Sequence, residues 1–110
     1  MKTTVKNGKV YNEQGEVAVL YSPGYGAGWS TWNDHDCLFT PEIVQLVIDK
    51  VPTEEIAIKC INLFGDDFYY GGVMDGLAIA WLKPGTRFRI NEDDGSESVD
   101  LETDEYWKIA

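Results

Sequence analysis

Apolar residues alternate with polar ones in the first and last thirds of the chain and recur at helical spacing in the middle. Near the start, Asn7-Gly8 separates two short alternating runs, and a two-residue type I′ turn needs positive φ at both positions. That turn sets Val5 opposite Val10 in a hairpin. The next run, Val17–Tyr21, is apolar on both faces, which predicts a strand inside a sheet rather than at its edge.

Two helices are predicted in the middle of the chain. The stretch Pro41–Val51 carries one apolar stripe, Thr40 stands at the N-cap position, and Pro52 prevents the helix from continuing. The stretch Glu54–Phe64 forms the second helix, and Gly65 suits its C-terminal end.

A second meander is predicted in the last third, around turns at 84–85 and 94–95. The Pro84-Gly85 turn sets Trp81 opposite Phe88 and Ile79 opposite Ile90. The Asp94-Gly95 turn continues that apolar face, because it sets Ile90 opposite Val99 and Phe88 opposite Leu101. A last short strand is expected over Tyr106–Ile109.

In chain order these elements form βββ-αα-ββββ. They predict a single α+β domain over residues 1–110, with a mainly antiparallel sheet built from two β-meanders and a central pair of helices. Hydrophobic residues make up 44% of the chain, which is enough for a packed core and argues against disorder.

Charge and cysteine content narrow the class of function. The formal net charge is −10, which disfavours direct binding to nucleic acid or to an anionic membrane. Cys37 and Cys60 do not have the spacing of a zinc site, and no run of 18 apolar residues or apolar leader is present. We therefore expect a cytoplasmic protein with reduced cysteines, no cofactor and no metal.

The segment 22–36, SPGYGAGWSTWNDHD, breaks every periodicity and is longer than most connections in a compact domain. Its glycines allow close approach of a ligand and can present N–H groups to an anion, and its aromatics can stack on a flat ring. The same aromatics can instead pack over the sheet in a purely structural loop. The candidate ligand-binding residues here are Gly24, Tyr25, Gly26, Gly28, Trp29, Ser30, Thr31 and Trp32, with Tyr69 and Tyr70 from a second irregular stretch rich in glycine and aromatics, Asp66–Gly76.

Arg87 and Arg89 are the two arginines of the chain and lie on one face of a predicted strand. They are candidates to hold an anionic ligand. The register of the 94–95 turn offers another role, because it sets Arg87 opposite Glu102 and Arg89 opposite Asp100 as cross-strand ion pairs.

His35 is the single histidine, flanked by Asp34 and Asp36. With a nearby serine or cysteine it can be arranged on paper as a hydrolase site, and the same three residues can be written as metal ligands. Consecutive loop side chains diverge, however, so these residues favour a solvated loop, and no catalytic or metal-binding residue is assigned.

The segments VAVLYSPGYGAGWSTW and WLKPGTRFRINEDDGSES resemble a group of short acidic proteins encoded by phages and prophages. The resemblance spans most of the chain and implies an accessory protein, with counter-defence as one role, but no catalytic residues. We expect a non-enzymatic protein that sequesters a small phosphate-bearing, nucleotide-like ligand through its glycine- and aromatic-rich loop. The alternative is an acidic inhibitor that docks on a basic surface of a host defence protein. A chain of this size buries only about two-thirds of its unfolded surface, so self-association to a homo-oligomer would stabilise it.

Overall fold

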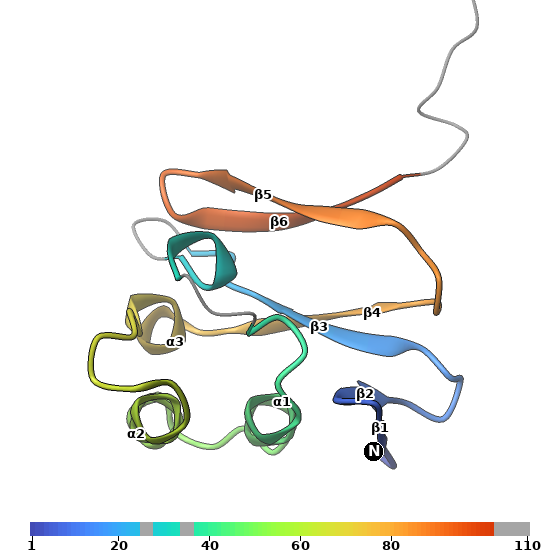
Figure 1. The fold of residues 1–110 in the computed structure, drawn as a ribbon, viewed down its shortest axis with the longest axis horizontal. Coiled ribbons are helices and arrows are strands. Elements are labelled where there is room, and N and C mark those ends of the chain that lie inside the picture. The colour runs from blue at the N-terminus through green and yellow to red at the C-terminus, as the bar shows by residue number, and fades with distance from the viewer. Residues whose placement is uncertain (25–27, 34–36, 103–110) are drawn as a thin grey trace, which may run out of the picture.

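The computed structural model describes residues 1–24, 28–33 and 37–102, and within these ranges the fold is α+β, as the sequence predicts (Figure 1). An antiparallel sheet has the order β1-β2-β3-β4, and β5 and β6 form a separate antiparallel hairpin. The strands are β1 (Thr4–Lys6), β2 (Lys9–Tyr11), β3 (Val17–Tyr21), β4 (Ala78–Leu82), β5 (Phe88–Asp93) and β6 (Ser96–Leu101). The helices are α1 (Pro41–Ile48), α2 (Thr53–Phe64) and α3 (Gly71–Asp75), with a 3₁₀ turn at Ser30–Trp32.

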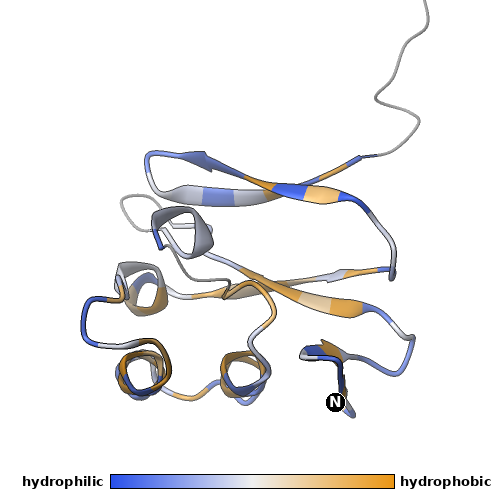
Figure 2. Cartoon of the chain, viewed as in Figure 1, coloured by the Kyte–Doolittle hydropathy of each residue, from blue (hydrophilic) through white to orange (hydrophobic). Residues whose placement is uncertain are grey.

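The faces of strands β3 and β4 are covered on both sides. Figure 1 shows the three helices on one side of these strands and the β5–β6 hairpin on the other. The hydropathy colouring in Figure 2 is strongest where α1, α2 and β3 face one another. Four of the five β3 residues are buried, which confirms the prediction of an interior strand. None of the helices in the described ranges has the length and hydropathy needed to cross a membrane.

Two of the predicted hairpins have the expected register. Asn7 and Gly8 both take positive φ, and Val5 pairs with Val10. Around Asp94-Gly95, Phe88 pairs with Leu101 and Ile90 with Val99. The apolar side chains of this hairpin are half-buried rather than fully buried.

The predicted pairing across Pro84-Gly85 is wrong. The turn itself forms, with a hydrogen bond from Thr86 N–H to the Lys83 carbonyl, but β4 pairs with β3 instead of β5. The physical reason is that β3 and β4 are apolar on both faces and are covered best in the middle layer. In contrast, β5 alternates between apolar and polar residues and suits a two-stranded layer with one side in water.

Helix boundaries also differ from the predicted ones. Helix α1 ends at Ile48, before Pro52, because Lys50 takes positive φ and closes a Schellman motif. In that motif Val51 N–H bonds to the Leu46 carbonyl and Lys50 N–H to the Val47 carbonyl. Helix α3 was not predicted from the sequence, and the strand expected over 106–109 lies outside the described residues.

Candidate functional site

The described part of the glycine- and aromatic-rich loop is held by one buried carboxylate, that of Glu97 on β6. The Glu97 side chain is 2% exposed. One carboxylate oxygen accepts from Ser22 N–H at 2.9 Å, and the other accepts from Trp29 N–H at 2.9 Å and Thr31 N–H at 3.1 Å. The Thr31 hydroxyl also donates to that second oxygen, at 2.5 Å. An anion from the chain itself therefore lies where the loop presents its N–H groups.

Glu97 was not among the candidate residues, although its position carries a signal. In the confirmed register it lies on the same side of β6 as Val99 and Leu101, facing the rest of the molecule. A carboxylate on an inward face needs hydrogen-bond donors, because a buried charge without partners is very costly. The loop is rich in backbone N–H groups and hydroxyls and supplies these donors. It lies beside β6 because Glu97 N–H donates to the carbonyl of Ser22, at the end of β3, at 2.7 Å.

Trp29 belongs to the core and not to an open binding surface, which corrects its assignment as a ligand contact. Its side chain is 0% exposed and packs edge-on against Phe64 and Phe68. The indole N–H donates to the Cys37 carbonyl at 3.3 Å. A large aromatic ring with one N–H fits this position because the ring fills the space between loop and helices while the N–H is satisfied.

Close contacts within the protein explain the described glycines of the two irregular stretches. A methyl group on Gly24 would overlap the Asp75 carboxylate, and one on Gly28 would overlap the Trp32 ring. A methyl group on Gly72, at the start of α3, would overlap the Gly28 carbonyl. Gly24 and Gly72 allow close contact between the loop and α3, and Gly28 allows close contact with the Trp32 ring of the same loop, so a ligand is not needed to explain them.

Asn33 joins the loop to the second irregular stretch. Its side-chain amide accepts from Tyr69 N–H at 2.8 Å and donates to the Tyr69 carbonyl at 3.0 Å. The Trp32 and Tyr69 rings lie with their centroids 5.1 Å apart. Together with Tyr70 and Met74, these two rings form a group of exposed apolar side chains, which we call the aromatic patch. The exposed fractions are 41% for Trp32, 39% for Tyr69, 43% for Tyr70 and 42% for Met74.

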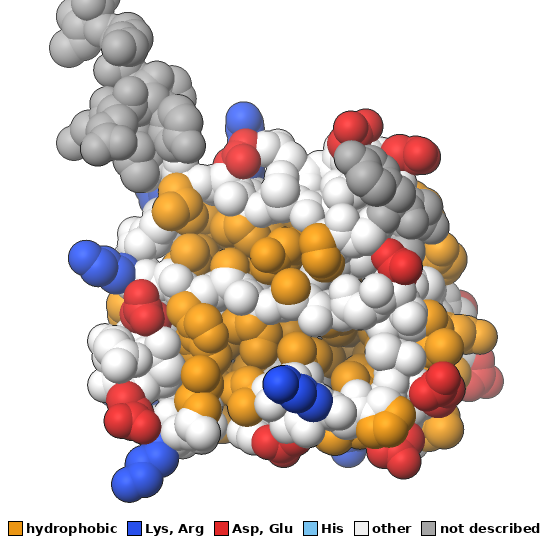
Figure 3. Space-filling model, turned by 180° about the vertical axis from the view of Figure 1, so that it is seen from behind, with side chains coloured by type: hydrophobic (Ala, Val, Ile, Leu, Met, Phe, Trp, Pro, Cys, Tyr) orange, Lys and Arg blue, Asp and Glu red, His pale blue; other side chains and the backbone are white. Residues whose placement is uncertain are grey.

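Carboxylates border the aromatic patch. The Trp32 indole N–H donates to Glu92 at 2.9 Å, and this bond, followed by that from Gly95 N–H, lowers the pKa of Glu92 below its ordinary value. Asp66, Asp67 and Asp75 are exposed in the same segments as the patch, and residues 28–33 and 60–82 contain no Lys or Arg. Figure 3 shows Asp and Glu side chains gathered at right, on the side where α2 and α3 lie.

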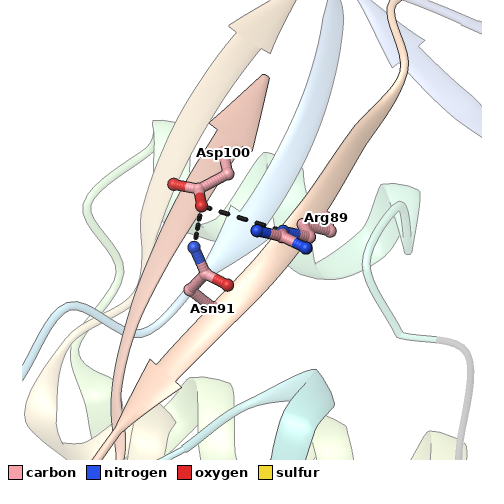
Figure 4. Close-up of polar contacts among 3 residues, drawn as sticks. All are labelled: Arg89, Asn91 and Asp100. Atoms are coloured by element: carbon pink, nitrogen blue, oxygen red, sulfur yellow. Dashed lines mark hydrogen bonds and ion pairs between the residues drawn. The ribbon is translucent and has the colours of Figure 1, made fainter. Parts of the chain in front are cut away.

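The arginines take the ion-pair role. Arg87 lies 2.9 Å from Glu102 and Arg89 lies 3.8 Å from Asp100, with both arginine side chains about four-fifths exposed. Asp100 also accepts from the Asn91 side chain (Figure 4). Because Arg89 and Glu97 lie on opposite faces of the hairpin, the arginines and the loop do not form one site.

The structure describes some of the remaining candidate residues and not others. Thr31 binds Glu97, Ser30 is half-buried in the 3₁₀ turn, and Tyr25 and Gly26 lie outside the described residues. The segment Asp34–Asp36, with His35, also lies outside them, and within the described residues no group of three His, Cys, Asp or Glu side chains has the arrangement of a metal site. Comparisons with protein-family models, curated proteins and solved structures found no match to this chain.

Proposed function

We propose that the protein is a non-catalytic binding protein whose aromatic patch, with the carboxylates that border it, docks on a basic surface of another protein. The observation that carries the proposal is the exposure of Trp32, Tyr69, Tyr70 and Met74, with the Trp32 and Tyr69 rings in contact. Aromatic residues and Met are enriched at the centres of protein interfaces, and a few such side chains supply most of the binding energy.

Two members of the patch, Trp32 and Tyr69, are held by contacts within the protein. The Trp32 ring is fixed by its bond to Glu92 and by the Tyr69 ring, and the Tyr69 backbone is fixed by Asn33. Side chains held in place before binding lose little conformational entropy on association, so more of the contact energy appears as affinity.

Charge favours a basic partner. The chain has a net charge of −10, and the segments that carry the patch contain carboxylates but no Lys or Arg. Such a surface attracts a positively charged protein and speeds its association. In the phage context that the sequence resemblance implies, a host defence protein with a basic surface is the partner class, and docking would block that surface.

The nucleotide-like ligand is supported less well. The N–H groups of Ser22, Trp29 and Thr31 bond to Glu97, and the Trp29 ring is buried. A phosphate would have to displace a carboxylate of the same charge from this place. For that reason the docking function is preferred to sequestration.

The test uses single substitutions in the patch. Trp32→Ala and Tyr70→Ala are compared with Val5→Ala, which removes an apolar side chain of β1 that is 61% exposed. The wild-type protein is used to capture partners from a bacterial lysate, and the captured protein is purified and titrated against each variant by calorimetry. We expect each patch variant to weaken binding by about tenfold or more, as for interface hot spots, and Val5→Ala to leave it unchanged. Unchanged affinity in both patch variants at near-native stability would refute the docking surface.

A further inference from the structure

The two edges of the four-stranded sheet differ in a way that indicates a second interface. Strand β1, at one edge, has three exposed residues including Lys6. Strand β4, at the other edge, has the sequence AIAWL, and its five residues are all half-buried. Residues 76–82 contain no charge and no proline. Within the described part of the chain, β4 pairs with β3 alone and its outer side has no strand partner.

Natural sheets protect their edges, because an open strand with unpaired N–H and C=O groups is a template for another strand. Lysine and short length protect β1 in this way. Strand β4 has neither protection, and its Ile79 and Trp81 are residue types enriched in strands. On the face turned away from the viewer of Figure 1, hydrophobic side chains gather in broad bands (Figure 3).

We propose that β4 pairs with β4 of a second copy of this chain, antiparallel and about a two-fold axis, so that two four-stranded sheets become one continuous sheet. With the axis at Ala80, Ile79 of each copy lies opposite Trp81 of the other, and Ala78 lies opposite Leu82. Every pair joins two apolar side chains, so the strand is complementary to itself, as a two-fold interface requires.

Charge favours a second copy of the chain, and not the basic protein proposed above, as the partner of the β4 edge. A basic surface gains nothing from β4, since the strand offers no carboxylate. Two copies of a chain with net charge −10 repel one another over most of their surfaces. The uncharged stretch 76–82 is where that repulsion is least. At its ends Asp75 precedes the strand and Lys83 follows it, so the antiparallel arrangement brings opposite charges to each end of the pairing.

The first test is the mass of the protein in solution. Sedimentation equilibrium at micromolar concentrations should give twice the 12.4 kDa of one chain. Leu82→Lys places a charge in the pairing and should raise the dimer dissociation constant by at least about tenfold. Val5→Lys makes the same kind of change on the protected edge and should leave the mass unchanged. A monomeric wild type, or a dimer that Leu82→Lys does not weaken, would overturn the proposal.

The second test fixes the register and does not depend on the folding of the lysine variant. In Ala80→Cys the two new thiols face each other across the axis, at a backbone separation of about 4.5–5.5 Å that a disulfide can span. Mild oxidation should then give a covalent dimer, whereas the wild type should give none, because Cys37 and Cys60 are both buried. Absence of the covalent dimer would overturn the Ala80 register. A chain ending at Glu102 that dimerises when the full chain does not would assign the β4 edge to residues 103–110 instead.

Discussion

At the scale of single residues, the Glu97 carboxylate accepts the loop N–H groups that were expected to bind an anionic ligand. Its carboxylate accepts three backbone N–H groups and one hydroxyl, and it connects β6 with the end of β3 and with the loop. A buried carboxylate is tolerated only with such partners, and each of these donors would be left without its acceptor if the carboxylate were removed.

Glu97→Gln should therefore destabilise the fold. The new amide group presents N–H to backbone N–H, which leaves at least one buried donor unsatisfied at a cost of about 1–3 kcal/mol in the free energy of unfolding. Urea unfolding of wild type and variant measures the difference. Glu92→Gln is the matched control on the neighbouring strand, and because Glu92 is exposed it should change the unfolding free energy much less. Equal effects of the two substitutions would contradict the role of Glu97.

Cys60 permits a prediction about pH. Burial raises the pKa of its thiol from 9.0 to about 12, since the thiolate would lose its hydration in the core. The folded pKa lies above the unfolded one, so this contribution to stability is complete below pH 9 and is lost as the pH rises toward 12. The melting temperature should fall less between pH 8 and about pH 10 in Cys60→Ala than in the wild type. Alkylation at pH 8, with the site located by peptide mass spectrometry, should be slower for native than for unfolded protein by at least about tenfold.

At the scale of elements, the contact between α3 and the loop depends on a backbone approach that only glycine allows. Gly72→Ala would place a methyl group against the Gly28 carbonyl, and the backbone must shift to relieve it. We expect a loss of about 1–3 kcal/mol in unfolding free energy. In Gly71→Ala the new methyl group meets the outer end of the exposed Tyr69 side chain, which can shift at lower cost than a backbone carbonyl, so the loss should be smaller. Circular dichroism during urea unfolding distinguishes the two, and a larger loss for Gly71→Ala would contradict this packing.

Three turns between strands that follow one another in the chain show which pairings the sequence can predict. The Asn7-Gly8 and Asp94-Gly95 turns determine their hairpins through the φ preferences of two residues, and both registers are confirmed. Pro84-Gly85 also makes a turn, but whether the strands beside it pair depends on a competitor far away in the chain. Strand β4 pairs with the distant β3, and no local pattern in the sequence reports that choice.

The loop illustrates the same limit for the site. Its glycines and aromatics indicated a special backbone and an anion, and Glu97 is an anion in that place. That the anion belongs to the chain itself, 66 residues from Thr31, could be inferred only by following the inward face of β6 and asking what satisfies its carboxylate. The aromatic patch was harder to predict. Trp29 and Trp32 are tryptophans three residues apart in the same loop, yet the first is buried and the second is 41% exposed.

At the scale of the whole molecule, the two proposed interaction surfaces differ in charge. The aromatic patch lies among carboxylates, whereas β4 is a neutral strand at the sheet edge. A dimer joined through β4 would carry two aromatic patches. A partner with two matching sites would then bind with an avidity greater than either contact alone.

The two surfaces should respond to salt in opposite directions. Between about 0.1 M and 1 M sodium chloride the Debye length falls from about 10 Å to about 3 Å, so interactions between exposed charges are largely removed. The attraction between the carboxylates around the aromatic patch and a basic protein is then lost, so the rate at which the two proteins associate should fall steeply. Repulsion between two chains of charge −10 is lost as well, so the dimer dissociation constant should fall while the apolar β4 contact is kept. Sedimentation equilibrium across this range measures the dimer. A dimer that dissociates as salt rises would mean that charged groups, and not the neutral strand, hold the two copies together.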